Sequence, residues 1–289
     1  TRGVHIVGDA PIFVAHQSAD VWARADQFLL DAQGEPLMVA GVPPDYFSAT
    51  GQRWGNPLYR WDAMERDGFT WWKQRLAHLF SLVDVARLDH FRGFEAFWEI
   101  PASDPTAEGG RWRDGPGEAF FASIRDALGP LPVIAEDLGV ITEGVTRLRR
   151  ACGFPGMRVM QFAFADTARN PYLPHNFGRC TVAYTGTHDN ATTVGWWAQA
   201  SEAERRAARD YLGPMADREI HWAMIQALSQ SVANTVVTPL QDVLGLDASH
   251  RMNTPGQPDG CWTWRFDWPD VGDEPAPRLA SLARAHGRT

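Results

Sequence analysis

Short apolar runs alternate along the chain with stretches in which apolar residues recur at helical spacing. The apolar runs are rich in β-branched residues and lie at 4–9, 83–89, 133–137, 157–164, 181–184 and 235–238. Helical spacing covers 69–80, 117–128, 142–150, 203–212, 217–233 and, more weakly, 278–285. Strands separated by helices pair in parallel through right-handed crossovers. The pattern therefore predicts an α/β protein with a parallel sheet.

Polar residues stand where several of the predicted strands end: Asp9, Asp89, Glu136, His188 and Asp189. A (β/α)8 TIM barrel takes its active-site residues from this position on several strands. A doubly wound sheet is the alternative, but no G-x-G-x-x-G phosphate loop follows any of the runs. Because six runs are present, we expect an incomplete barrel with strands 3–8 present and the first two β/α units missing. All of 1–289 would belong to this one catalytic domain.

The stretch 31–56 has no sustained period and is rich in glycine, proline and aromatic residues. It therefore predicts a long loop. A loop of about 25 residues is unusual in a compact protein and is more often functional than a simple connection. We expect this stretch to border the functional site.

Composition narrows the class of partner. The net charge of −8 and the pI near 5.6 argue against nucleic acid or an anionic membrane and favour a neutral or cationic substrate. No apolar run approaches the roughly 18 residues that a membrane span needs. The three widely spaced cysteines suggest neither a disulfide framework nor a zinc site, which fits a reducing cytoplasm. Thirteen tryptophans are either core residues or platforms for sugar rings.

The central stretch of the chain ends in a charged pair, Arg87 and Asp89. Side chains two apart in a strand point to the same face, so these two groups should lie side by side. The guanidinium keeps the carboxyl ionised, because an opposite charge lowers its pKa. An ionised, oriented carboxylate can act as a nucleophile, although the pair by itself is more often a structural ion pair at a strand end.

Further carboxylates suggest which chemistry the site performs. Cleavage of a glycosidic bond with retention needs an ionised nucleophile and a protonated acid about 5–5.5 Å apart. Asp89 suits the first role. Glu136 follows the apolar run 133–135, where burial would raise its pKa toward that of an acid. Asp189, beside His188, could hold sugar hydroxyls and favour a distorted, oxocarbenium-like ring.

Several blocks of the sequence resemble one enzyme family. They are 9–14 (DAPIFV), 87–93 (RLDHFRG), 135–139 (AEDLG) and 187–190 (THDN), together with 41–48 (GVPPDYFS) and 51–57 (GQRWGNP). The chain resembles the amylomaltases, the 4-α-glucanotransferases or disproportionating enzymes of glycoside hydrolase family 77 in the α-amylase clan. The last two blocks separate this family from ordinary α-amylases. The resemblance extends over 3–268, and every catalytic position matches the family pattern.

The resemblance implies a role for each candidate residue. Asp89 would be the nucleophile, Glu136 the acid/base and Asp189 the stabiliser of the transition state. The loop 41–57 would cover the donor glucan. The expected substrate contacts are Asp9, Tyr46, Phe47, Gln52, Trp54, Arg87, His90, His188 and Asn253.

The family also implies the reaction and what it requires. It passes the donor half of an α-1,4-glucan such as maltodextrin through a covalent intermediate to the 4-hydroxyl of an acceptor sugar. It needs no cofactor and no metal. The family normally carries roughly two hundred further residues before this point, so we expect full activity to need that N-terminal segment as a partner.

Three alternatives stay open at this stage. The nearest is an α-amylase-type hydrolase, and the second is a catalytically inactive glucan-binding fragment. A metal-dependent barrel hydrolase is the third, but only His90 and His188 adjoin key carboxylates, and no H-x-H occurs in a predicted strand.

Other residues receive structural interpretations. We expect Asp137 to cap a helix N-terminus and Thr142 to cap the helix 142–150. The basic residues Arg147, Arg149 and Arg150 suit a solvated helix C-terminus. The pairs Trp71-Trp72 and Trp196-Trp197 are interpreted as core or interface and not as sugar platforms.

Overall fold

A computed structural model describes residues 3–44, 48–257 and 259–288. The chain divides into two compact units, Thr1–Gly156 (unit 1) and Met157–Thr289 (unit 2). Each unit is described by itself. None of the helices in the described ranges is long and apolar enough to cross a membrane.

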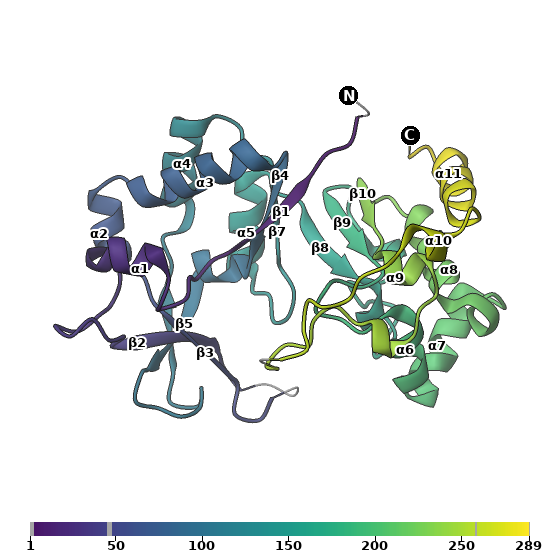
Figure 1. The fold of residues 1–289 in the computed structure, drawn as a ribbon, viewed down its shortest axis with the longest axis horizontal. Coiled ribbons are helices and arrows are strands. Elements are labelled where there is room, and N and C mark those ends of the chain that lie inside the picture. Colours follow the sequence, from purple (N-terminus) through teal and green to yellow (C-terminus); the bar gives the residue numbers. More distant parts are fainter. Residues whose placement is uncertain (1–2, 45–47, 258, 289) are drawn as a thin grey trace. The chain divides into compact units, whose positions relative to one another are not determined.

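Unit 1 contains parallel strands that run in the order β1 (Val7–Pro11), β4 (Val85–Asp89) and β7 (Val133–Ala135). Strand β7 is apolar and buried throughout, as is usual for a parallel strand covered on both faces, whereas β1 is mostly exposed. The register places Asp9 of β1 opposite Arg87 of β4. The three strands lie side by side in Figure 1. The polar residues that the sequence singled out stand at or near their carboxyl ends, as the strand prediction required.

One long edge of this sheet is open in the described chain. Strand β1 pairs with β4, and the apolar side chains before and within it are solvent-exposed: Val4 by 79%, Ile6 by 57% and Val7 by 52%. An unpaired edge with apolar side chains is a surface that proteins normally cover.

A second, antiparallel sheet in unit 1 was not predicted. Its order is β3 (Gln52–Pro57), β2 (Met38–Val42), β5 (Ala96–Pro101) and β6 (Arg111–Asp114). The prediction of one loop over 31–56 is therefore wrong, since β2 and most of β3 lie inside it. Gly41 shows why the sequence did not predict strand β2. The backbone of β3 comes so close to it that a Cβ at position 41 would lie within 2.1 Å of the Gln52 carbonyl oxygen. Close backbone approach requires a glycine that lowers strand propensity.

The helices of unit 1 enclose a core rich in aromatic rings. Their bounds are α1 (Ala19–Ala23), α2 (Trp61–Arg66), α3 (Thr70–Leu82), α4 (Gly117–Leu128) and α5 (Glu143–Cys152). Trp72 is fully buried, and its ring contacts those of Phe94 and Phe120 at 5.5 and 5.3 Å. The interpretation of Trp71-Trp72 as core is confirmed. Thr142 caps α5 by accepting a hydrogen bond from the Val145 amide, as predicted.

Unit 2 contains β8 (Gly156–Val159, starting at the last residue of unit 1), β9 (Thr181–Tyr184) and β10 (Thr235–Val237), in that order. Strands β9 and β10 are parallel. Six helices follow or separate them: α6 (Thr193–Gln199), α7 (Glu202–Leu212), α8 (Ala216–Ser229), α9 (Leu240–Val243), α10 (Trp268–Val271) and α11 (Pro275–Ala285). Each of the six predicted apolar runs thus contains a strand in the described structure. That the whole chain is one domain stays a prediction.

Short 3-10 helices complete the two units. They are η1 (Ala25–Gln27), η2 (Phe91–Phe94), η3 (Met160–Phe162), η4 (Pro174–Asn176) and η5 (Ala248–His250). Helix η2 matters for function, because it fixes the chain that leaves β4 beside Asp89.

A buried ion pair joins Asp137 to helix α5. Asp137 is 3% exposed, and Arg149, at 9%, places its Nε 3.1 Å from the Asp137 Oδ2. Arg149 also donates a hydrogen bond to the Phe154 carbonyl. The predictions of a helix cap at Asp137 and a solvated Arg149 are therefore wrong. Both predictions failed for the same reason: helix α5 directs the Arg149 side chain into the protein. The position of Arg149 near a helix end does not reveal this direction.

Replacing Arg149 by methionine should lower the free energy of unfolding by about 3–5 kcal/mol, because the buried charge of Asp137 would lose the guanidinium that balances it. Urea unfolding measures the change. The matched control is Arg150→Met on the exposed face of the same helix, where we expect a change within about 0.5 kcal/mol. Equal effects at both positions would contradict the assignment.

Candidate functional site

Arg87 is the central group of the candidate site in unit 1. Its side chain is only 11% exposed. The Nη1 atom bonds to both carboxylate oxygens of Asp9, at 2.8 and 2.9 Å, and Nη2 bonds to the Asp89 Oδ1 at 2.7 Å. Flanking carboxylates raise the pKa of Arg87 despite burial. The guanidinium therefore stays charged and fixes the Asp89 side chain, as the sequence predicted for this pair.

The Glu136 side chain is held by backbone amides. It directly follows β7, and its Oε2 accepts a hydrogen bond from the His90 amide at 2.8 Å while its Oε1 accepts one from the Leu138 amide at 2.9 Å. The main chain of Glu136 is fixed as well, since its amide donates to the Leu88 carbonyl at 3.0 Å. The carboxyl group is thus oriented by the two strands that it joins.

The pKa of Glu136 is raised to about 7. Burial is the largest cause, and the negative charge of Asp89 adds to it. Arg87 and the two backbone amides oppose the shift, because they favour the ionised form. Burial and the neighbouring carboxylate outweigh them. Near neutral pH this carboxyl can hold a proton, whereas Asp89 accepts a hydrogen bond from the Arg87 guanidinium.

His90, Trp54 and Gln52 form a second set of contacts in unit 1. The Trp54 ring stands edge-on to the His90 ring with centroids 4.8 Å apart, and the Trp54 Nε1 donates to the Gln52 Oε1 at 3.0 Å. Burial, with the charge of Arg92, lowers the pKa of His90 to about 4. His90 is therefore a neutral ring. Gln52 and Trp54 lie on strand β3, not on a loop.

Unit 1 thus brings together seven of the predicted residues: Asp9, Gln52, Trp54, Arg87, Asp89, His90 and Glu136. Tyr46 and Phe47 lie outside the described residues, and their predicted roles stay predictions.

A smaller group of predicted residues meets in unit 2. The Asp189 Oδ1 accepts a hydrogen bond from the Asn253 Nδ2 at 2.5 Å, and the His188 Nε2 lies 3.3 Å from the Asp189 Oδ2. The Asn253 amide donates to the His188 carbonyl at 3.1 Å. Asn253, which the family resemblance named as a substrate contact, is therefore a direct neighbour of the carboxylate.

Arg251 and Asp242 were missed by the sequence. The Arg251 guanidinium donates to the main-chain carbonyls of Asp189 and Asn253, so it holds both residues through their backbone. Its place two residues before Asn253 was the available signal. Asp242 gave none, because its partners are 49 and 57 residues away.

Asp242 is a buried carboxylate that supports the Asp189 segment. It is 1% exposed. It accepts hydrogen bonds from the Thr185 hydroxyl, at the end of β9, and from both the amide and the hydroxyl of Thr193, in the first turn of α6. Burial raises its pKa. The segment that carries His188 and Asp189 is thereby tied at both ends to one side chain.

No cluster of three or more His, Cys, Asp or Glu side chains with metal-binding geometry occurs in the described ranges. The contacts of the candidate carboxylates are instead with guanidinium, amide and imidazole groups.

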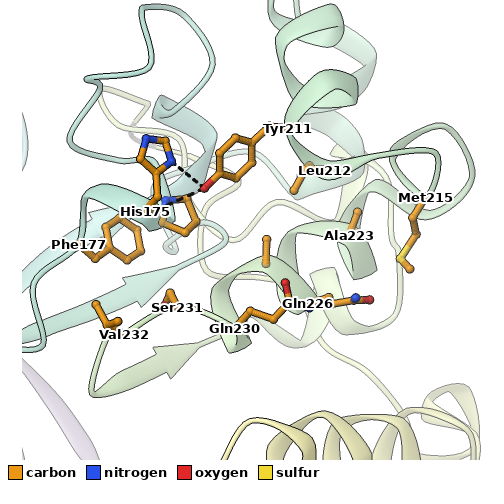
Figure 2. Close-up of a pocket in the computed structure, with 12 residues that line it drawn as sticks. His175, Phe177, Tyr211, Leu212, Met215, Ala223, Gln226, Gln230, Ser231 and Val232 are labelled. Carbon is orange, nitrogen blue, oxygen red and sulfur yellow. Dashed lines mark hydrogen bonds between the residues drawn. The ribbon is translucent and has the colours of Figure 1, made fainter.

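A pocket of about 440 Å³ in unit 2 lies between η4, α7 and α8 (Figure 2). Figure 2 shows the Tyr211 hydroxyl directed at His175, whose Nδ1 is 3.0 Å away. The lining includes neither Asp nor Glu; it consists of Pro174, His175, Phe177, Tyr211, Leu212, Met215, Ala223, Gln226, Ala227, Gln230, Ser231 and Val232. Without a carboxylate, this pocket lacks the nucleophile and acid of glycoside cleavage, and it is not the candidate catalytic site.

Comparison with known proteins identifies the family. A family model described as 4-α-glucanotransferase, of glycoside hydrolase family 77, matches residues 1–270. The chain belongs to this family. The resemblance that the sequence motifs suggested is confirmed.

Individual members of the 4-α-glucanotransferase family are similar over nearly all of this chain. The Thermus thermophilus 4-α-glucanotransferase is 52% identical over 99% of this chain, which corresponds to 59% of that protein. The chloroplastic/amyloplastic enzyme of Solanum tuberosum is 48% identical over 100% of this chain and 50% of its own length. The chain therefore spans little more than half the length of these relatives.

A solved structure shows the same fold. The amylomaltase from Streptococcus agalactiae in complex with acarbose has a TM-score of 0.95 and 39% sequence identity, covering 99% of this chain and 58% of its own. The parallel α/β fold predicted from the sequence is thus that of an amylomaltase.

Replacing Asp242 by alanine should destabilise the protein by about 3 kcal/mol or more. Three donors on Thr185 and Thr193 would lose their acceptor, and each buried unsatisfied group costs about 1–3 kcal/mol. Urea unfolding provides the measurement, and the exposed Asp247→Ala is the control. If both variants unfold at the same urea concentration, the hydrogen bonds of Asp242 do not stabilise the segment between Thr185 and Thr193.

Proposed function

We propose that the protein is a retaining 4-α-glucanotransferase that moves α-1,4-glucan segments from a donor to an acceptor maltodextrin or glucose. The observation that carries the proposal is the contrast between Asp89 and Glu136 in unit 1. One carboxylate is bound to a buried guanidinium and the other has a pKa raised to about 7. Retaining glycoside chemistry needs such a pair, and the family membership supplies the substrate class.

In the first step, an Asp89 oxygen attacks the anomeric carbon of the donor. Arg87 binds the Oδ1, and in the described structure no hydrogen bond is made by the Oδ2, which leaves that oxygen for the attack. Glu136 gives its proton to the oxygen of the departing sugar as the glycosidic bond breaks. The products are a covalent glycosyl–Asp89 ester and a free 4-hydroxyl on the leaving chain.

The second step reverses the roles. The ionised Glu136 takes the proton of an acceptor 4-hydroxyl, whose oxygen attacks the same anomeric carbon and releases Asp89. Two inversions give net retention, and Glu136 regains the proton that it lost. The cycle needs side chains alone, without a cofactor or a metal.

Asp189 stabilises the transition state in this proposal. An anion oriented by His188 and Asn253 can hold sugar hydroxyls and favour the positively charged, distorted ring. Asp9, Arg87, His90, His188 and Asn253 then contact or support the bound sugar, as do Gln52 and Trp54 on β3. Tyr46 and Phe47 have the same role by resemblance, within the substrate-covering segment 41–57.

We also propose a wider setting for the site. The parallel strands would be strands 3–8 of a (β/α)8 barrel, with the exposed apolar edge of β1 covered by an additional segment of the kind that the longer relatives contain. The odd number and wide spacing of the cysteines favour a reducing compartment, which in a bacterium is the cytoplasm.

Replacing Asp89 by asparagine should lower transfer between maltotriose units by about 10⁴-fold or more, because no nucleophile remains. The assay uses the complete gene product and resolves the maltodextrins formed. The exposed Asp126→Asn on helix α4 should keep wild-type activity. Near-normal transfer by Asp89→Asn would refute the assignment.

The same product analysis separates the alternatives. Longer and shorter maltodextrins with a constant number of reducing ends indicate transfer. A rise in reducing ends indicates an α-amylase-type hydrolase, and sugar binding without any turnover indicates a glucan-binding fragment. Either of the last two results in the wild-type protein would overturn the proposed function.

The pH dependence follows from the pKa of Glu136. The first step needs this carboxyl protonated, so kcat/KM should fall as pH rises through about 7, approaching a tenfold loss per pH unit above it. A pH–rate profile between pH 5 and 9 measures this with about equal ionic strength throughout. A value of kcat/KM that stays constant to pH 9 would contradict Glu136 as the acid.

A further inference from the structure

Trp262 has an unusual backbone conformation. Among the described residues, three that are not glycine have a positive φ: Phe69, His90 and Trp262, the last at 62°. A left-handed backbone is strained for a bulky side chain and persists only where the surroundings impose it. His90 directly follows Asp89 in the candidate site. The positive φ of Trp262 therefore raises the question of whether this residue also lies at a functional site.

Two contacts impose this conformation. The Trp262 amide donates a hydrogen bond to the Met252 carbonyl at 2.7 Å, and the neighbouring Cys261 Sγ accepts one from the Thr254 amide at 3.3 Å. These bonds close the base of the loop 252–262. The loop begins beside Asn253, whose side chain is bonded to Asp189, so Trp262 is brought back to the residues that hold this carboxylate.

The Trp262 side chain is placed beside the candidate site but is not buried there. Its ring centroid lies 5.1 Å from that of His188, with the planes inclined by 39°. The residue is nevertheless 54% exposed. Exposure alone does not distinguish it, since Trp268 is 78% exposed. Trp262 differs because its exposed ring also lies against His188 and is held by a left-handed backbone. Here a strained backbone presents an aromatic surface to solvent.

We propose that Trp262 is a sugar-binding platform of the Asp189 group, on which the apolar face of a pyranose ring stacks. This inference rests on the proposed function. The indole offers a flat, polarisable face, which suits the axial C–H groups of a glucosyl ring. His188 fixes one side of the indole, while Asp189 and Asn253 supply the polar partners that a sugar's hydroxyl groups require. A neutral, ring-shaped carbohydrate matches this combination of surfaces.

The test measures sugar binding separately from turnover. In the complete gene product carrying Asp89→Asn, the Kd for maltotriose is measured by calorimetry with and without Trp262→Ala. We expect Trp262→Ala to raise this Kd by about tenfold or more. Trp262→Phe, which keeps an aromatic face, should recover part of the affinity. Trp268→Ala is the matched control, since Trp268 is 78% exposed on the same C-terminal segment.

Trp262→Gly distinguishes a binding role from a structural one. Glycine adopts a positive φ without strain, so this variant should unfold at a temperature no lower than Trp262→Ala while binding sugar as weakly. A purely structural role predicts the opposite, namely a destabilised Trp262→Gly protein whose folded fraction binds maltotriose normally.

The outcomes separate the two proposals. If the wild-type protein lacks transfer activity, the proposed function fails. If the wild-type protein is active and all Trp262 variants bind maltotriose like the control, the platform is refuted while the proposed function stands. A loss of affinity in Trp262→Ala and Trp262→Gly, but not in Trp268→Ala, supports the platform.

Discussion

The buried guanidinium of Arg87 is the interaction on which the rest of the site in unit 1 depends. It binds Asp9 and Asp89 together, so two carboxylates at the ends of neighbouring strands share one positive charge. A buried cation of this kind must be balanced, since its desolvation is costly. The parallel register between β1 and β4 meets that need by placing Asp9 opposite Arg87. The register of the sheet thus also determines which charges meet in the site.

The contrast between Asp89 and Glu136 follows from this arrangement. Both carboxyl groups are near Arg87, but Asp89 has the direct hydrogen bond, whereas Glu136 has greater burial and the repulsion of Asp89. Two similar side chains therefore stand in different electrostatic environments. In unit 2, Asp189 is oriented differently, by Asn253 and His188, and its segment is tied down by the buried Asp242.

Some of these features have clear sequence signals. The strands around Arg87 and Glu136 are short apolar runs followed by charged residues, which periodicity detects directly. The motifs that carry the family resemblance surround the same residues, and the family is confirmed. The antiparallel sheet of unit 1 had no comparable signal. Its strands β2 and β3 contain Gly41 and Gly55, and a segment rich in glycine resembles a loop until its pairing partners are known.

The sequence by itself determined the alternation of strands and helices, the residues at the strand ends and the family, because these depend on local periodicity and on contiguous motifs. Only the tertiary structure decided which distant groups meet. Arg149 turned inward to Asp137, Asp242 joined Thr185 to Thr193, and Trp262 was carried back to His188. Each of these contacts depends on the path of the chain between residues well apart in sequence. Burial and the contacting partners then set the environment of each side chain. Neither can be predicted from the residues next to it in the chain.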